Sequence, residues 1–116
     1  MHELSIAVSL VEAASDVLSK LGETRVEAVR LKLGPLAGVV KDALLFSFDI
    51  AAAGTALEGV RLDIEDVPVT IWCTRCSAER VLSAVTSRRC PACDTLAAGI
   101  VRGDELQLVG LQVRDT

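Results

Sequence analysis

The chain has 116 residues, with 12 basic and 16 acidic side chains and a formal net charge of −4. A surface that follows a nucleic-acid backbone needs excess lysine and arginine, so this balance argues against a nucleic-acid binder. No uncharged run exceeds eight residues, which is too short to span a bilayer, and no signal peptide is visible at the start. The first expectation is a single small cytoplasmic protein with a core of valine, leucine and isoleucine.

Two stretches have the pattern of amphipathic helices. Residues 4–21 repeat apolar side chains at spacings of three and four, and Gly22 follows as a stop signal. Residues 42–53 predict a second helix, with Asp42 as its candidate N-cap and Gly54 as its candidate stop. The apolar face expected for the first helix consists of Leu4, Ala7, Val11, Ala14, Leu18 and Leu21.

Three stretches alternate apolar and polar side chains, as half-solvated strands do. They cover residues 25–33, 59–66 and 104–113, and a β-bulge near Gly110 would absorb a change of phase in the last one. A turn at 34–38 follows the first strand, and the helix after it suits a crossover between parallel strands. The sequence therefore predicts an α+β fold: a small three-stranded mixed sheet with two helices.

An insert at 67–103 separates the last two of these strands and differs in composition. It carries five arginines against two acidic residues, and it contains all four cysteines. A segment of fewer than about 40 residues buries too little surface to fold unaided. The insert therefore needs additional stabilisation, such as a bound metal or disulfides. The fold is thus predicted to be interrupted by a zinc-ribbon-like module with four cysteines.

The cysteines form two C-x-x-C pairs, Cys73 with Cys76 and Cys90 with Cys93, separated by 13 residues that include RVLSAV, enough for a short strand. Two such knuckles can supply four thiolates in the tetrahedral arrangement that Zn²⁺ prefers, and a site with four protein ligands is structural rather than catalytic. Iron in the same cage, a redox dithiol and disulfides are the alternatives.

The only histidine of the chain is His2. The amine of Met1 and the amide nitrogen and imidazole of His2 can chelate one metal ion, and Glu3 can add its amide nitrogen or carboxylate. A planar set of nitrogens favours Ni(II) or Cu(II). The alternative interpretation is a solvated terminal histidine without a role.

Several motifs then occur together in one order: MHELS, VEAVRLKLG before PLAGV, DALLFSFD, the paired C-x-x-C motifs and a closing GDEL. In this combination the chain resembles the HypA/HybF family of hydrogenase maturation proteins, which are nickel metallochaperones. The resemblance implies a nickel-binding αβ domain of residues 1–66 plus 104–116 and a zinc-binding domain of residues 67–103. It implies nickel ligands at Met1, His2 and Glu3 and zinc ligands at Cys73, Cys76, Cys90 and Cys93.

The resemblance also implies how the protein works. Nickel would be passed, with a hydrogenase-maturation GTPase, to the large-subunit precursor of [NiFe] hydrogenase or to urease, and a homodimer is a further expectation. Neither nucleic acid nor a membrane is an expected partner. The chain departs from the family at Lys41, where proline is common, and it lacks the histidines that flank the zinc cysteines in some members.

An enzyme is not expected, because the sequence has no P-loop, no glycine-rich cofactor fingerprint and no nucleophile–base pair outside the cysteines. Besides the nickel carrier, two further functions are alternatives. One is an enzyme with a catalytic zinc, which would need an open, exchangeable position at the metal. A zinc-ribbon module could bind a protein or nucleic acid, the latter through Arg75, Arg80, Arg88 and Arg89, without nickel transfer.

Overall fold

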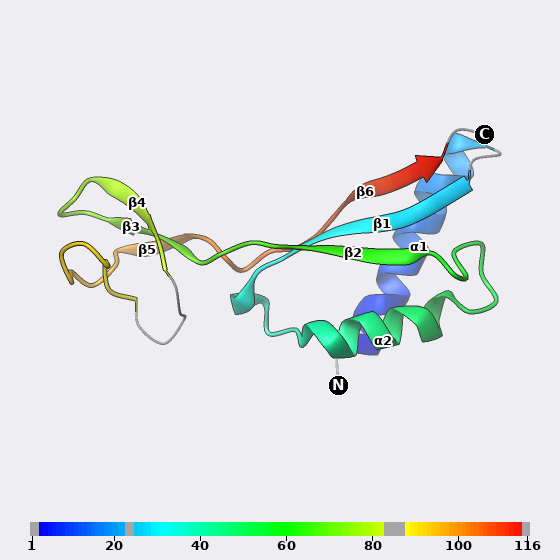
Figure 1. The fold of residues 1–116 in the computed structure, drawn as a ribbon, viewed down its shortest axis with the longest axis horizontal. Coiled ribbons are helices and arrows are strands. Elements are labelled where there is room, and N and C mark those ends of the chain that lie inside the picture. Colours follow the sequence, from blue (N-terminus) through cyan, green and yellow to red (C-terminus); the bar gives the residue numbers. More distant parts are fainter. Residues whose placement is uncertain (1–2, 23–24, 83–87, 115–116) are drawn as a thin grey trace. The chain divides into compact units, whose positions relative to one another are not determined.

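The computed structural model describes residues 3–22, 25–82 and 88–114. It contains two compact units (Figure 1), the first within Met1–Leu31, Val39–Ile64 and Leu108–Thr116, and the second within Lys32–Gly38 and Glu65–Gln107. The elements are α1 (Glu3–Leu21), β1 (Arg25–Leu33), the short 3₁₀ helix η1 (Pro35–Ala37), α2 (Lys41–Ala52), β2 (Arg61–Asp66), β3 (Thr70–Cys73), β4 (Ala78–Val81), β5 (Gly99–Arg102) and β6 (Leu106–Arg114).

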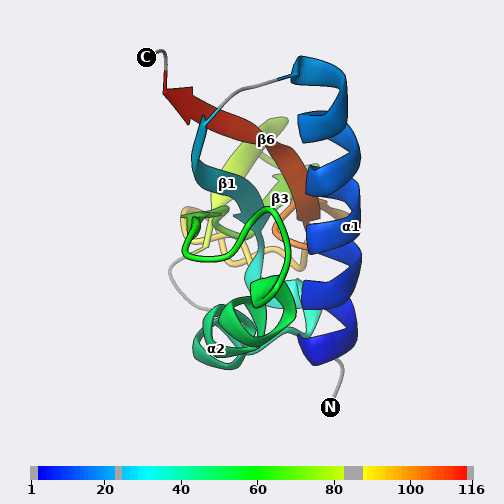
Figure 2. The same ribbon diagram turned by 90° about the vertical axis from the view of Figure 1, so that its right-hand side faces the viewer.

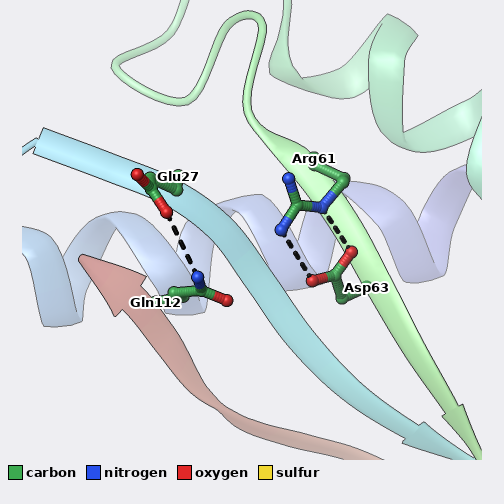
Figure 3. A network of polar contacts seen from close by, with 4 residues as sticks. All are labelled: Glu27, Arg61, Asp63 and Gln112. Carbon is green, nitrogen blue, oxygen red and sulfur yellow. Dashed lines mark hydrogen bonds and ion pairs between the residues drawn. The ribbon is translucent and has the colours of Figure 1, made fainter. Parts of the chain in front are cut away.

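The strands form two sheets of three, in the orders β2-β1-β6 and β4-β3-β5. In the first sheet β1 and β2 run the same way and β6 runs against them (Figure 3), so the predicted mixed sheet is confirmed. The helix α2 lies in the crossover between the parallel strands, as expected. β6 is one continuous strand, and the β-bulge near Gly110 stays a prediction.

The core of the first unit lies between the helices and one face of the mixed sheet, along which α1 runs (Figure 2). Phe48 and Leu44 of α2 and Leu31 of β1 are almost fully buried there. The predicted apolar face of α1 is too long at both ends, since Leu4 and Leu21 are 46% and 49% exposed. The buried residues of α1 are Ala7, Leu10, Val11 and Ala14, so the core covers only the middle of the helix.

The opposite face of the mixed sheet is polar (Figure 3). The amide nitrogen of Gln112 in β6 donates to a carboxylate oxygen of Glu27 in β1 at 3.1 Å. In β2, the guanidinium of Arg61 makes two hydrogen bonds to the carboxylate of Asp63, at 2.5 and 3.0 Å. Polar contacts of this kind across and along strands are typical of a sheet with only one face in a core.

The predicted role of Asp42 as the N-cap of α2 is wrong. The helix begins one residue earlier than expected, at Lys41, and Val40 is its N-cap residue, without a side-chain cap. The backbone at Val40 is extended, so Asp42 falls inside the first helical turn. A carboxylate there still faces the positive end of the helix dipole, which explains why an acidic residue is favourable at this position.

The turn after β1 requires glycine for a reason that its sequence does not reveal. The amide of Gly34 donates to the carbonyl oxygen of Glu105, and the amide of Leu36 donates to that of Gly103, both at 2.8 Å. A Cβ atom on Gly34 would overlap the carbonyl group of Gly103. The two backbones therefore approach so closely that no side chain fits between them.

Candidate metal centre

The four cysteines of the two C-x-x-C motifs come together in the second unit. Their Sγ atoms all lie within 4.8 Å of one another, and they are the one such group of potential metal ligands among the residues that the structure describes. Cys73 and Cys90 are buried, and Cys76 and Cys93 are half-buried. The spacing of the motifs therefore correctly predicted which side chains gather.

The first knuckle is the turn of a hairpin. Strands β3 and β4 pair antiparallel, with Cys73 opposite Ala78, so the hairpin closes directly at the first ligand. The amide of Cys76 donates to Sγ of Cys73 at 3.4 Å. Ser77, the residue after the second cysteine, has a φ of 53°. The left-handed residue turns the chain back into β4 and leaves both sulfurs on one side.

The second knuckle repeats this local structure without a hairpin of regular strands. The amide of Ala92 donates to Sγ of Cys90 at 3.4 Å, and Asp94, again the residue after the second cysteine, has a φ of 62°. The amide of Asp94 donates to the carbonyl oxygen of Cys90 at 2.8 Å. Aspartate tolerates the left-handed conformation better than most residues, which suits it to this position.

The distances between the sulfurs fit a tetrahedral metal site. Cys73 Sγ lies 3.5 Å from Cys93 Sγ, and Cys76 Sγ lies 3.6 Å from Cys93 Sγ and 3.9 Å from Cys90 Sγ. A tetrahedron of sulfurs about 2.3 Å from a central Zn²⁺ has edges of about 3.8 Å. A disulfide would need about 2.05 Å, and all four cysteines are free thiols.

The pKa values of the cysteine thiols differ. The pKa of Cys93 is lowered to about 6, chiefly by the hydroxyl of Thr95, whose Oγ1 lies 3.2 Å from Sγ, and then by its amide. The pKa of Cys76 is raised to about 11, chiefly because the Cys93 sulfur holds its proton in a hydrogen bond. Without a cation the cluster therefore keeps protons, and a divalent metal is what allows all four sulfurs to ionise.

The donor set fits Zn²⁺ better than a hard cation, because four thiolates are soft ligands and the geometry is tetrahedral. Cys73, Cys76, Cys90 and Cys93 would hold the ion, and they fill all four positions. Such a centre has no open position for a substrate and supplies folding free energy instead of catalysis.

The N-terminal residues Met1 and His2 lie outside the described residues. Glu3 is the first residue of α1, and its carboxylate Oε2 accepts a hydrogen bond of 3.2 Å from the amide of Val40, the N-cap residue of α2. This amide, followed by the amide of Glu3 itself, lowers the pKa of the carboxyl group below its usual 4.5. Glu3 thus ties the start of α1 to the start of α2, a contact over 37 residues that sequence patterns could not reveal.

The strands of the second sheet were only partly predicted. β4 covers the first two residues of RVLSAV and begins earlier, at Ala78, whereas the last three residues of that stretch lie outside the described residues. β3 and β5 were missed, because each has four residues and neither shows a clear alternation. A run of TIWC ending at a ligand cysteine was the available signal for β3.

Comparison with known proteins first identifies the class. The sequence model of the family described as "Hydrogenase/urease nickel incorporation, metallochaperone, hypA" matches residues 1–113. Proteins of this class are metallochaperones that act in maturation and are not enzymes.

The chain belongs to the HypA family. It is 51% identical over 115 residues to the hydrogenase maturation factor HypA of Roseiflexus sp. strain RS-1, an alignment that covers 99% of this chain and 94% of that protein. It is 53% identical over 112 residues to HypA of Chloroflexus aurantiacus J-10-fl, covering 97% and 98%. The solution structure of the nickel metallochaperone HypA from Helicobacter pylori has the same fold, with a TM-score of 0.66, 24% identity and 97% of each chain covered.

None of the described helices is long and apolar enough to cross a membrane.

Proposed function

We propose that this protein carries Ni(II) at its N-terminus and delivers it to the large-subunit precursor of [NiFe] hydrogenase. The observation that carries the proposal is the match of the family sequence model from residue 1 to residue 113, which begins at the Met1–His2–Glu3 sequence. The Met1 amine, the His2 amide nitrogen and the His2 imidazole can close a five- and a six-membered chelate ring. A planar nitrogen set of this kind favours Ni(II).

The fourth nickel position is assigned to the backbone amide of Glu3. Its carboxylate accepts the hydrogen bond from the Val40 amide, so it already has a role in holding the two helices together. The amide nitrogen of Glu3 continues the chelate from the same chain end. Binding at the amide deprotonates it, which removes the hydrogen bond that it makes to its own carboxylate.

In the same proposal Zn²⁺ occupies the four-cysteine centre and stays there. Residues 1–66 plus 104–116 are then the nickel domain and residues 67–103 the zinc domain. The two sites select different metals through their ligands, because soft thiolates favour zinc whereas a planar set of nitrogens favours nickel. Ligands at a chain end can be surrendered to an acceptor without unfolding a core, whereas four ligands on two knuckles cannot.

Delivery is proposed to occur in the cytoplasm, in complex with a hydrogenase-maturation GTPase, and urease is the alternative acceptor. Four free thiols support a reducing compartment. A homodimer is part of the proposal, and nucleic acid and membranes are not. An acidic chain with a net charge of −4 supports the exclusion of nucleic acid.

The proposal is tested by extending the chain. Untagged, zinc-loaded protein is titrated with Ni(II) beside a variant that carries Gly-Ser in front of Met1. The extension moves the free amine two residues away and leaves His2, Glu3 and the cysteines intact, so we expect the nickel site to be lost while zinc content and helical circular dichroism are unchanged. Equal nickel stoichiometry and affinity in both proteins would contradict the terminal site and favour a zinc-ribbon interaction module.

A further inference from the structure

One arginine of the second unit, Arg80, is half-buried on the side of its sheet that carries the cysteine centre. Arg80 of β4 pairs with Ile71 of β3, two positions along from the pair of Ala78 with Cys73. Paired residues of an antiparallel sheet share a face, and alternate residues along a strand do as well. Arg80 therefore lies on the face of the sheet that carries the Cys73 ligand, whereas Trp72 and Glu79 lie on the other face.

The guanidinium of Arg80 is placed against sulfurs from both knuckles. Its Nε atom is buried and has no hydrogen-bond partner in the described part of the chain. Cys76 and then Cys90 are the groups that raise the pKa of Arg80 above its usual value, through side-chain hydrogen bonds and through charge. Cys76 is the second ligand of the first knuckle and Cys90 the first ligand of the second.

Three other arginines of this unit, Arg102, Arg89 and Arg75, differ from Arg80 in their partners or in their exposure. Arg102 is ion-paired with Glu79 of β4, which lies on the face opposite the cysteines. Nη1 of Arg89 donates to the backbone carbonyl oxygen of Asp94 at 3.1 Å. Arg75 lies between the two cysteines of the first knuckle, and its side chain is exposed.

A charged group with a buried donor needs an anion beside it. Arginine stays protonated in proteins, and burial of a donor without a partner costs free energy. Four thiolates around a divalent cation carry a net charge of −2, and this charge is what the guanidinium can compensate. Hydrogen bonds from nitrogen donors also withdraw electron density from thiolates, which makes them less open to protonation and to electrophiles.

We propose that Arg80 is a positioning residue of the metal centre, whose guanidinium clamps Cys76 to Cys90 across the two knuckles and thereby slows loss of the metal. The proposal rests on metal occupancy of the four cysteines and is independent of nickel binding at the N-terminus. Supporting groups around metal ligands change metal affinity by about 10- to 100-fold when they are removed.

The test measures zinc transfer from the full-length, zinc-loaded protein to the chromogenic chelator 4-(2-pyridylazo)resorcinol. Three variants are compared with the parent protein: Arg80→Gln, Arg80→Lys and, as the matched control, Arg75→Gln. The control removes the same charge from the first knuckle at an exposed position. A parallel readout is the rate of cysteine alkylation by iodoacetamide.

We expect Arg80→Gln to release zinc about 10- to 100-fold faster and to be alkylated faster, in line with the loss of a supporting group. Arg80→Lys keeps the positive charge but loses the several donors of the planar guanidinium. Its rate of zinc release should therefore lie between those of the parent protein and Arg80→Gln. If Arg80→Gln does not accumulate as folded protein, the zinc-release rate of Arg80→Lys is compared with that of the parent protein instead. Arg75→Gln should match the parent protein.

Equal release from the parent and both Arg80 variants would overturn the proposal. So would an equal acceleration in Arg75→Gln, because the effect would then be one of charge alone. Zinc analysis of the parent protein separates these results from a failure of the metal assignment. A parent protein without stoichiometric zinc overturns the clamp together with the zinc site, and leaves the nickel test untouched.

Discussion

Removal of the metal from the four cysteines is expected to unfold the second unit and to leave the first unit folded. Binding of structural zinc contributes about 10–16 kcal/mol in comparable small zinc modules, whereas the core of a domain below about 70 residues rarely supplies more than about 3–5 kcal/mol of net stability. The buried apolar side chains of the second unit are few: Leu33, Val67, Val69 and Ile71 besides the ligands Cys73 and Cys90. Both helices belong to the first unit, which has its own core.

The sequence offers two separate probes for this experiment. Trp72 is the only tryptophan of the chain and lies in β3, so its emission and anisotropy report on the second unit. Helical circular dichroism reports on α1 and α2. As chelator removes one zinc ion per chain, the tryptophan signal should change fully while most helical signal persists, and added zinc should reverse the change. An unchanged tryptophan signal in metal-free protein would contradict the account.

Substitution of the only histidine is expected to abolish tight nickel binding. His2→Ala removes the imidazole and with it the six-membered chelate ring, so the loss should exceed the about 10- to 100-fold that removal of a supporting group costs. Zinc content and helical signal should stay as in the parent protein, because the substitution leaves the four cysteines and the described core residues unchanged. The measurement is competition of zinc-loaded protein with a nickel indicator.

The matched control for His2→Ala is Ser5→Ala. Ser5 is exposed in the first turn of α1, close to the terminus in sequence, and supplies no ligand in the proposal. It should bind one Ni(II) with the affinity of the parent protein. If His2→Ala behaves in the same way as this control, nickel is bound elsewhere and the terminal chelate is wrong.

Local patterns were sufficient for the elements of the first unit. The alternation over residues 25–33 predicted β1 with its observed bounds, and the periodicity of residues 4–21 missed only the first residue of α1. These features depend on neighbours along the chain. The extent of the buried face did not follow in the same way, because the exposure of Leu4 and Leu21 depends on how far other elements cover α1.

Contacts between distant residues explain the other differences. Asp42 looked like an N-cap because its residue type and position suited one, but the chain enters the helix at Val40, whose amide is bonded by Glu3. The need for Gly34 arises from the backbone at Gly103, 69 positions later in the numbering. The cysteine centre was predictable because the two C-x-x-C motifs carry their own local geometry and need only one long-range contact.

The central claim is that one chain sorts two metals, with nickel on terminal nitrogens and zinc on four sulfurs. X-ray absorption spectra at both metal edges of one sample, loaded with one equivalent of each metal, test it most directly. The account predicts four sulfur neighbours at about 2.3 Å around zinc, and only nitrogen or oxygen neighbours with an imidazole signature around nickel. Sulfur in the nickel shell, or fewer than four sulfurs at zinc, would contradict it.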